Sequence, residues 1–165
     1  MAGHPQRGGS FTVVSAKASI LIARPAEPVF TFVAVDFFKN YQRWSPEVQR
    51  LELLSPGPVR VGSSARQVRV DQGRRTETSF RVSVFDPPRR VEFVETANRF
   101  HIHYHLDPVG GQTRLTFAFA LTRVELFMRP FEKLIRVAVQ DGAAQVVRNI
   151  KGLVEREVPD QNSSC

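Results

Sequence analysis

His101, His103 and His105 occupy alternate positions in one segment, a spacing that could bring imidazoles together around a metal ion. In a β-strand, alternate residues point to the same face, so the three rings would share one side. The intervening residues of this segment are apolar or aromatic: Phe100, Ile102, Tyr104 and Leu106. Because a core needs that apolar side, the pattern predicts that the histidines face solvent. We expect no metal here, since ligands from a single strand also need a fourth partner.

Tyr104 and Tyr41 are the two tyrosines of the chain, and each combines an apolar ring with a polar hydroxyl. Tyr104 lies in an otherwise apolar row, so its hydroxyl must find a hydrogen-bond partner once it is buried. That partner is either a backbone carbonyl at the rim of a cavity or a bound ligand. With a ligand, the hydroxyl would orient or protonate a carbonyl group, and we favour orientation over catalysis.

Glu95 shares its parity with Val91 and Phe93 in a predicted strand, and it points inward if they do. A buried carboxyl group has a raised pKa and could act as an acid or a base. The strand register leaves this orientation open, as it does for residues 66–70. Glu95 is thus a third candidate catalytic residue beside the two tyrosines.

The composition indicates one ordinary domain. The chain has 165 residues, of which 42% are hydrophobic and 13 are Phe, enough for a single sizeable core. No apolar run approaches the ~18 residues of a membrane span, and the first residues lack the apolar core of a secretory signal. We therefore expect a cytoplasmic protein. Cys165 is the single cysteine, which excludes an intramolecular disulfide and a cysteine metal cage. No cofactor is expected.

The net charge of +7 raises the question of a nucleic-acid or membrane partner. The basic residues are mostly Arg and are scattered singly or in pairs, such as 74–75 and 89–90. No basic run is interleaved with aromatic residues, as it is in proteins that bind single strands. We expect no nucleic-acid partner. An interaction module that uses a basic surface on a membrane or RNA stays as a further alternative.

Period-two alternation predicts seven strands, at 11–23, 47–54, 61–70, 75–85, 90–96, 99–107 and 113–123. Pro25 and Pro28 indicate a turn that leads into short helices before Pro46. One long amphipathic helix is predicted between Pro130 and Glu157. Its apolar stripe, which must lie on the covered face of the sheet, consists of Ile135, Val139, Ala143, Val146, Val147, Ile150 and Val154.

In this order, six motifs resemble the START-like, Bet v 1-like helix-grip superfamily (SRPBCC), especially its bacterial polyketide cyclase/dehydrase-like members. They are ILIARPAEPVFTFVAVDF, WSPEV, GPVRVGSSARQVRV, VSVFDPPRRVEF, FHIHYHLDPVGGQTRLTFAF and the closing helix. The resemblance covers residues 11–157. It implies an α+β helix-grip fold, in which a curved seven-stranded antiparallel sheet wraps around the long C-terminal helix and two short helices follow the first strand. Residues 1–10 and 158–165 are predicted to be flexible tails.

The resemblance also implies a deep, largely apolar cavity between helix and sheet. We therefore expect the chain to bind an apolar or aromatic small molecule, lipid-, quinone- or polyketide-like, as carrier, sensor or chaperone. A polyketide cyclase or dehydratase that acts in the same cavity is the alternative. The expected oligomeric state is a monomer or weak homodimer. The predicted lining of the cavity is Trp44, Phe80, Val82, Phe93, Ile102, Tyr104, Phe117, Phe119, Phe127, Phe131, Ile135 and Ala138.

If the three histidines face solvent, the fold does not depend on them. Replacing His101, His103 and His105 together by Ser or Gln should lower the free energy of unfolding only modestly, by about 0.5 kcal/mol or less per site. Urea denaturation of the metal-free protein measures this change. A loss of several kcal/mol, or of ligand binding, would mean that the predicted strand faces are inverted.

Overall fold

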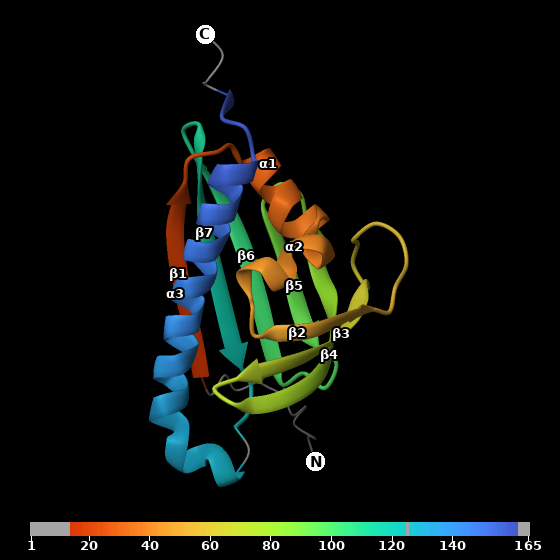
Figure 1. The fold of residues 1–165 in the computed structure, drawn as a ribbon, viewed down its shortest axis with the longest axis vertical. Helices are drawn as coiled ribbons and strands as arrows, with labels where there is room; N and C mark the ends of the chain where they lie inside the picture. Colours follow the sequence, from red (N-terminus) through yellow and green to blue (C-terminus); the bar gives the residue numbers. More distant parts are fainter. Residues whose placement is uncertain (1–13, 125, 162–165) are drawn as a thin grey trace, which may run out of the picture.

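The computed structural model describes residues 14–124 and 126–161. Its strands form one antiparallel sheet in the order β1-β7-β6-β5-β4-β3-β2 (Figure 1). The strands are β1 (Val14–Ile22), β2 (Val48–Leu53), β3 (Ser64–Asp71), β4 (Arg74–Asp86), β5 (Arg90–Glu95), β6 (Phe100–Val109) and β7 (Gln112–Leu121). All seven predicted strands are therefore confirmed, with ends that differ by a few residues.

The helices are α1 (Ala26–Phe30), a π-helical turn η1 (Thr31–Val35), α2 (Phe37–Trp44), a 3-10 turn η2 (Leu126–Phe131) and α3 (Glu132–Glu157). The extended backbone of Pro25 precedes α1, and Pro28 occupies its first turn, where a missing N–H group costs nothing. The long predicted helix begins at Glu132 because Pro130 lies in the 3-10 turn before it. In the described part of the chain, no helix is both long and apolar enough to cross a membrane.

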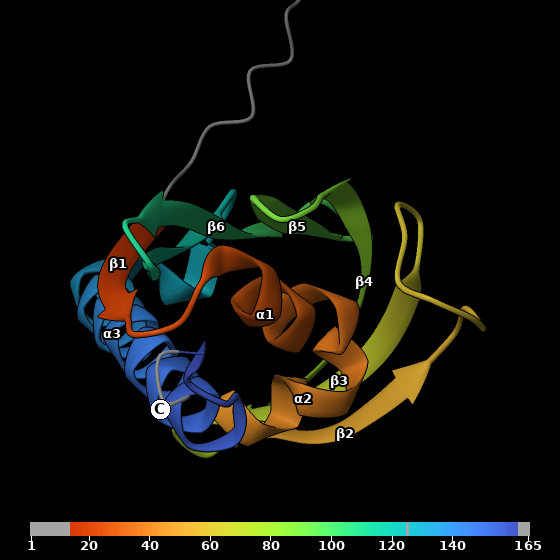
Figure 2. The same cartoon turned by 90° about the horizontal axis from the view of Figure 1, so that it is seen from above.

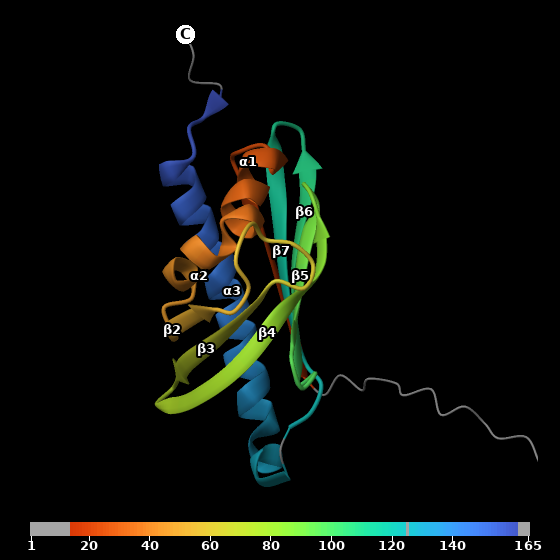
Figure 3. The same cartoon turned by 90° about the vertical axis from the view of Figure 1, so that its right-hand side faces the viewer.

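The helices lie on one side of a curved sheet, which confirms the predicted helix-grip fold. Figure 2 shows the sheet curling around α1 and α2, and Figure 3 shows all three α-helices on the same side of β5, β6 and β7. The last helix, α3, lies along β1 and β7. Arg24 ties its end to the segment after β1, because its guanidinium donates to the carbonyls of Glu155 (2.7 Å) and Val158 (2.8 Å). The contacts of the domain thus extend to Val158.

The strand register aligns the inward-facing side chains in rows across the sheet. One row runs through Ala16, Phe119, Ile102, Phe93 and Val82, and the next runs through Ala18, Phe117, Tyr104, Val91 and Phe85. On α3, Ala143, Val147, Ile150 and Val154 are buried at steps of three and four residues. The core therefore lies between the inner face of the sheet and the C-terminal half of α3.

The hairpin between β3 and β4 turns on two residues with left-handed backbone, Gln72 (φ 50°) and Gly73 (φ 81°). Two such residues form the tight turn whose twist matches that of the flanking strands. A glycine adopts this conformation without the clash that a Cβ atom causes.

Gly73→Ala should therefore destabilise the protein by about 1–2 kcal/mol through backbone strain alone, since no heavy atom lies within 4 Å of the added Cβ. Gly111→Ala is the matched control, because its surroundings are equally open and its φ lies outside the left-handed region. Thermal melts of the two variants make the comparison. Equal melting temperatures would refute the turn assignment.

Candidate functional site

Phe37 of α2 lies at the centre of an aromatic cluster that joins α2 to the sheet. Its ring centroid is 4.3 Å from Phe93, 5.8 Å from Trp44, and 6.2 Å from both Phe80 and Tyr104. Trp44 ends α2 and is 1% exposed, so it anchors this packing inside the protein. Four predicted lining residues thus pack against one another and against α2.

Burial decreases along the inner face of the sheet, away from this cluster. Leu106 is 2% exposed, whereas Ile102 and Phe119 on the same face remain partly exposed. On α3, Ala143 is 1% exposed but Val139, one turn earlier, is partly exposed. Strands β6 and β7 have neighbours on both sides, so an inward side chain stays accessible only where the described residues leave it uncovered from the helix side. This partly exposed apolar part of the inner face is the candidate binding site.

The first half of α3 lies level with this site. Gln140 exchanges two hydrogen bonds with the backbone of Lys17, at 3.0 and 3.4 Å, beside the row that contains Phe119 and Ile102. Ile135, five residues earlier on the helix, is also partly exposed. The helix therefore borders the site without burying it.

Some of the remaining predicted lining residues are buried in the core, and others are exposed or partly exposed on or next to α3. Phe117 and Val82 are 7% and 1% exposed in the inward rows. Phe131, just before α3, is 50% exposed, and Ala138 is partly exposed. Ala138 lies about 140° around the helix from the buried stripe, because each residue turns the helix by about 100°. The side chain of Phe127 lies outside the described residues.

Tyr41 belongs to a buried hydrogen-bond network whose members the sequence did not predict. Its hydroxyl donates to Oε1 of Gln67 (2.9 Å) and accepts from the guanidinium of Arg69 (3.1 Å). The Gln67 amide donates in turn to Thr78 (3.2 Å), and Arg69 pairs with Asp71 (3.0 Å). Burial raises the pKa of Tyr41, although Arg69 opposes the change. The tyrosine is thus neutral and its hydroxyl is fully bonded.

Tyr104 has a different arrangement. Its hydroxyl accepts a hydrogen bond from Nε1 of Trp44 (3.2 Å), and its proton has no acceptor among the described residues. Burial raises the pKa of Tyr104 well above its ordinary value. The side chain is 1% exposed. Tyr104 therefore offers a neutral donor and cannot act as a base near neutral pH.

Glu95 faces inward and is 2% exposed. The expectation that its net pKa is raised is wrong. Burial raises the pKa of the carboxyl group. Arg99, through its guanidinium and its backbone N–H, and the N–H of Ala97 together lower the pKa by more than burial raises it, so the net pKa lies below the ordinary value. Its oxygens accept from both N–H groups and pair with the guanidinium at 2.7 Å. This carboxylate closes the turn between β5 and β6.

The three histidines lie on the face of the sheet away from the helices, as their parity predicts, and all are partly exposed. Burial lowers the pKa of His103, while Glu92, across from it on β5, acts in the opposite direction. Glu92 is a residue that the sequence analysis missed. Identifying it needs the register between β5 and β6, which follows from the length of their turn.

Two depressions have volumes of about 160 and 380 Å³; the first lies over β2, β3 and β4, and the second lies over β3, β4 and the turn after β5. Both include Arg66 and Glu77, which lie 3.8 Å apart. Arg66 also pairs with Glu52 at 2.9 Å. Charged linings of this kind do not suit an apolar ligand.

A protein family described as polyketide cyclase / dehydrase and lipid transport matches residues 13–155 of the chain. No curated protein sequence matches this chain. Solved structures show the same fold at low sequence identity. The protein TTHA0849 from Thermus thermophilus is 18% identical with a TM-score of 0.70, covering 88% of this chain and 99% of that one.

Two further structures are similar. The Zhui aromatase/cyclase from Streptomyces sp. R1128 is 15% identical with a TM-score of 0.70, covering 92% of this chain and 98% of that one. A START superfamily protein from Mycobacterium smegmatis is 16% identical with a TM-score of 0.69, covering 86% and 97%. At these identities the likeness shows the fold alone.

Glu95→Gln should lower the free energy of unfolding by roughly 1–3 kcal/mol near pH 7, because a neutral amide loses its charge-assisted bonds. A carboxyl group whose pKa is lowered by folding stabilises the protein above its ordinary pKa, and this stabilisation is lost as the pH falls. The difference between wild type and variant should therefore shrink towards about pH 3.

Urea denaturation at both pH values measures the effect. Glu52→Gln is the control, since its carboxylate is 50% exposed and pairs on the surface with Arg66. Equal losses in the two variants, or a difference that does not change with pH, would contradict the assignment.

Proposed function

The chain belongs to the polyketide cyclase / dehydrase and lipid transport family, within the START-like, Bet v 1-like superfamily, and from this we propose that it binds an apolar or aromatic small molecule between its sheet and α3. The observation that carries the proposal is the accessibility of Ile102 and Phe119 on the inner face of central strands. Side chains at such positions are ordinarily covered by the core. A lipid-, quinone- or polyketide-like ligand would cover them here, with the chain as carrier, sensor or chaperone.

Apolar contact supplies the affinity of such a complex. Burial of apolar surface contributes ~25 cal/mol per Å², so a flat ligand against Phe119, Ile102 and Val139 needs no charged partner. Tyr104 supplies the polar contact in this proposal. Its free proton could orient a carbonyl group of the ligand, but the hydroxyl is reached only if Trp44 or α2 moves, because Tyr104 is 1% exposed.

The state of the ionisable groups favours binding over catalysis. Acid–base catalysis needs a group that takes and returns a proton near the working pH. Tyr41 and Tyr104 have raised pKa values, and the Glu95 carboxylate is ionised and occupied by Arg99. None of the three sequence-predicted candidates meets that requirement.

A cyclase or dehydratase is the second candidate function. The unpaired proton of Tyr104 is the observation in its favour, because a donor held in an apolar site polarises a substrate carbonyl. In such an enzyme the site would fold a flexible chain into a reactive conformation.

Filling the site from the helix side should block binding. Val139→Phe adds a larger ring beside the partly exposed apolar face and should weaken binding of the fluorescent probe 8-anilinonaphthalene-1-sulfonate by about tenfold or more, a change of about 1.4 kcal/mol. The control is Leu134→Phe on the same helix, where the wild-type side chain is 68% exposed. It should leave probe affinity unchanged.

Fluorescence titrations and thermal melts of both variants make the test. Native mass spectrometry of freshly purified protein looks for a co-purified ligand. A wild-type protein that binds no apolar probe, or equal losses in the two variants, would rule out the proposed site.

A further inference from the structure

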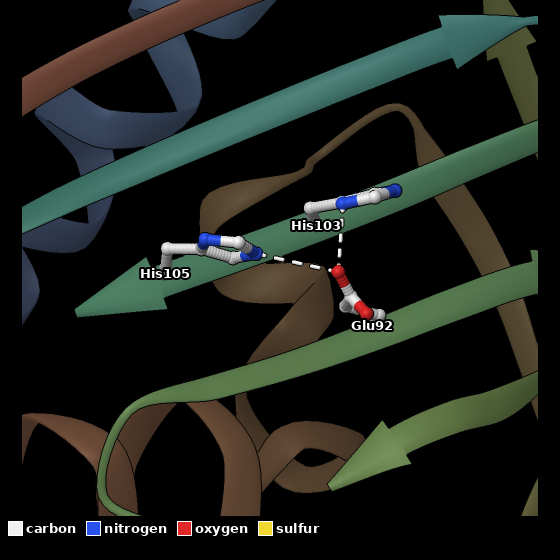
Figure 4. Close-up of side chains that lie close together, drawn as sticks. All are labelled: Glu92, His103 and His105. Carbon is white, nitrogen blue, oxygen red and sulfur yellow. Dashed lines mark hydrogen bonds and ion pairs between the residues drawn. The ribbon is translucent and has the colours of Figure 1, made fainter. Parts of the chain in front are cut away.

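Glu92, His103 and His105 converge on the outer face of the sheet, away from the proposed ligand site (Figure 4). Oε1 of Glu92 is 2.8 Å from Nδ1 of His103 and 3.3 Å from Nε2 of His105. One oxygen or nitrogen from each residue lies within 4.8 Å of the other two. The cluster thus holds three potential metal ligands from two adjacent strands.

The sequence argued against a metal because the histidines of one strand lack a further ligand. The register removes that objection, because Glu92 on β5 lies directly across from His103 on β6. Strands β5 and β6 are interior strands of the sheet, so their backbones hold the three residues at fixed positions. Figure 4 shows both imidazole rings directed towards the same carboxylate.

The distances fit a small tetrahedral ion. Zn²⁺ binds histidine nitrogen and carboxylate oxygen at about 2.0–2.2 Å, which places two ligand atoms of a tetrahedral site roughly 3.3 Å apart. The two nitrogen–oxygen distances in the cluster, 2.8 and 3.3 Å, are close to that separation. The nitrogens of the two histidines lie within 4.8 Å of each other, so an ion would draw the three ligand atoms together by rotation of the side chains.

The surroundings of the cluster allow access from solvent. The histidine side chains are 37% and 43% exposed, and that of Glu92 is 14% exposed. Arg90 lies across from His105 in the register, and its positive charge opposes a cation. Its guanidinium lies 3.7 Å from the carboxylate of Asp86, which partly offsets its charge.

We propose that Glu92, His103 and His105 form a binding site for a divalent transition-metal ion, best suited to Zn²⁺, with the fourth position occupied by water. Two imidazoles and a carboxylate are the ligand types that Zn²⁺ accepts, and three protein ligands leave one position free. This site is independent of the ligand site on the inner face.

Isothermal titration calorimetry with ZnCl2 tests the proposal on the full chain after treatment with EDTA and dialysis. All proteins carry His4→Ala, so that the histidine of the N-terminal segment cannot contribute. The parent protein should bind one ion per chain. His103→Ala, His105→Ala and Glu92→Gln should each weaken binding by about tenfold or more. His101→Ala is the matched control, because His101 lies on the same strand face outside the cluster, and its affinity should not change.

Two further measurements separate binding from loss of fold. Far-UV circular dichroism and thermal melts without metal show that each variant is folded, and Glu92→Gln nearly keeps the shape of the side chain. Titration with Co²⁺ should give the strong visible absorption of tetrahedral coordination, reduced in the same three variants. Absence of Zn²⁺ binding by the parent, or an equal loss in His101→Ala, would overturn the proposal.

Discussion

The packing of α2 onto the inner face of the sheet, through Phe37, decides where this molecule is closed and where it is accessible. The ring touches side chains of β4, β5 and β6 as well as its own helix. Truncation of such a buried ring typically lowers the free energy of unfolding by about 3–5 kcal/mol, so separating α2 from the sheet at this end is energetically costly. The helix α3 covers the core only along its second half. The accessible apolar surface therefore lies at the other end, beside the first half of α3.

The polar groups of the interior mainly serve the structure. Throughout the described part of the chain, every buried side-chain nitrogen and oxygen has a hydrogen-bond partner. Asn40, for example, donates to the carbonyl of Phe32 at 3.0 Å. In a low-dielectric interior such bonds define one arrangement, because an unpaired group is costly. Tyr104 differs in that its oxygen accepts from Trp44, while its proton has no acceptor among the described residues.

Strand β6 carries two separate kinds of chemistry on its two faces. Ile102 and Tyr104 belong to the inward rows, while His103 and His105 face outward beside Glu92. Alternation along one strand thus places partly exposed apolar side chains and a polar cluster back to back on a single sheet. The shared fold of the family dictates neither of them, because a site depends on the particular side chains that a fold presents.

The sequence by itself determined the elements and their faces. Alternation is a local property of a strand, so it predicted the inward direction of Tyr104 and Phe117 and the outward direction of the histidines. The prolines and the apolar stripe likewise predicted the short helices and α3. The sequence could not determine which side chains from different elements contact each other. The pKa of Glu95 depends on Arg99, which reaches it through a turn at Asn98 with left-handed backbone (φ 58°). The pairing of Glu92 with His103 depends on the same turn, because turn length sets the register. The sequence also could not show which inward aromatic residues border a ligand site and which are buried in the core. The packing of α2 against the sheet decides this, and that packing is a property of the tertiary structure.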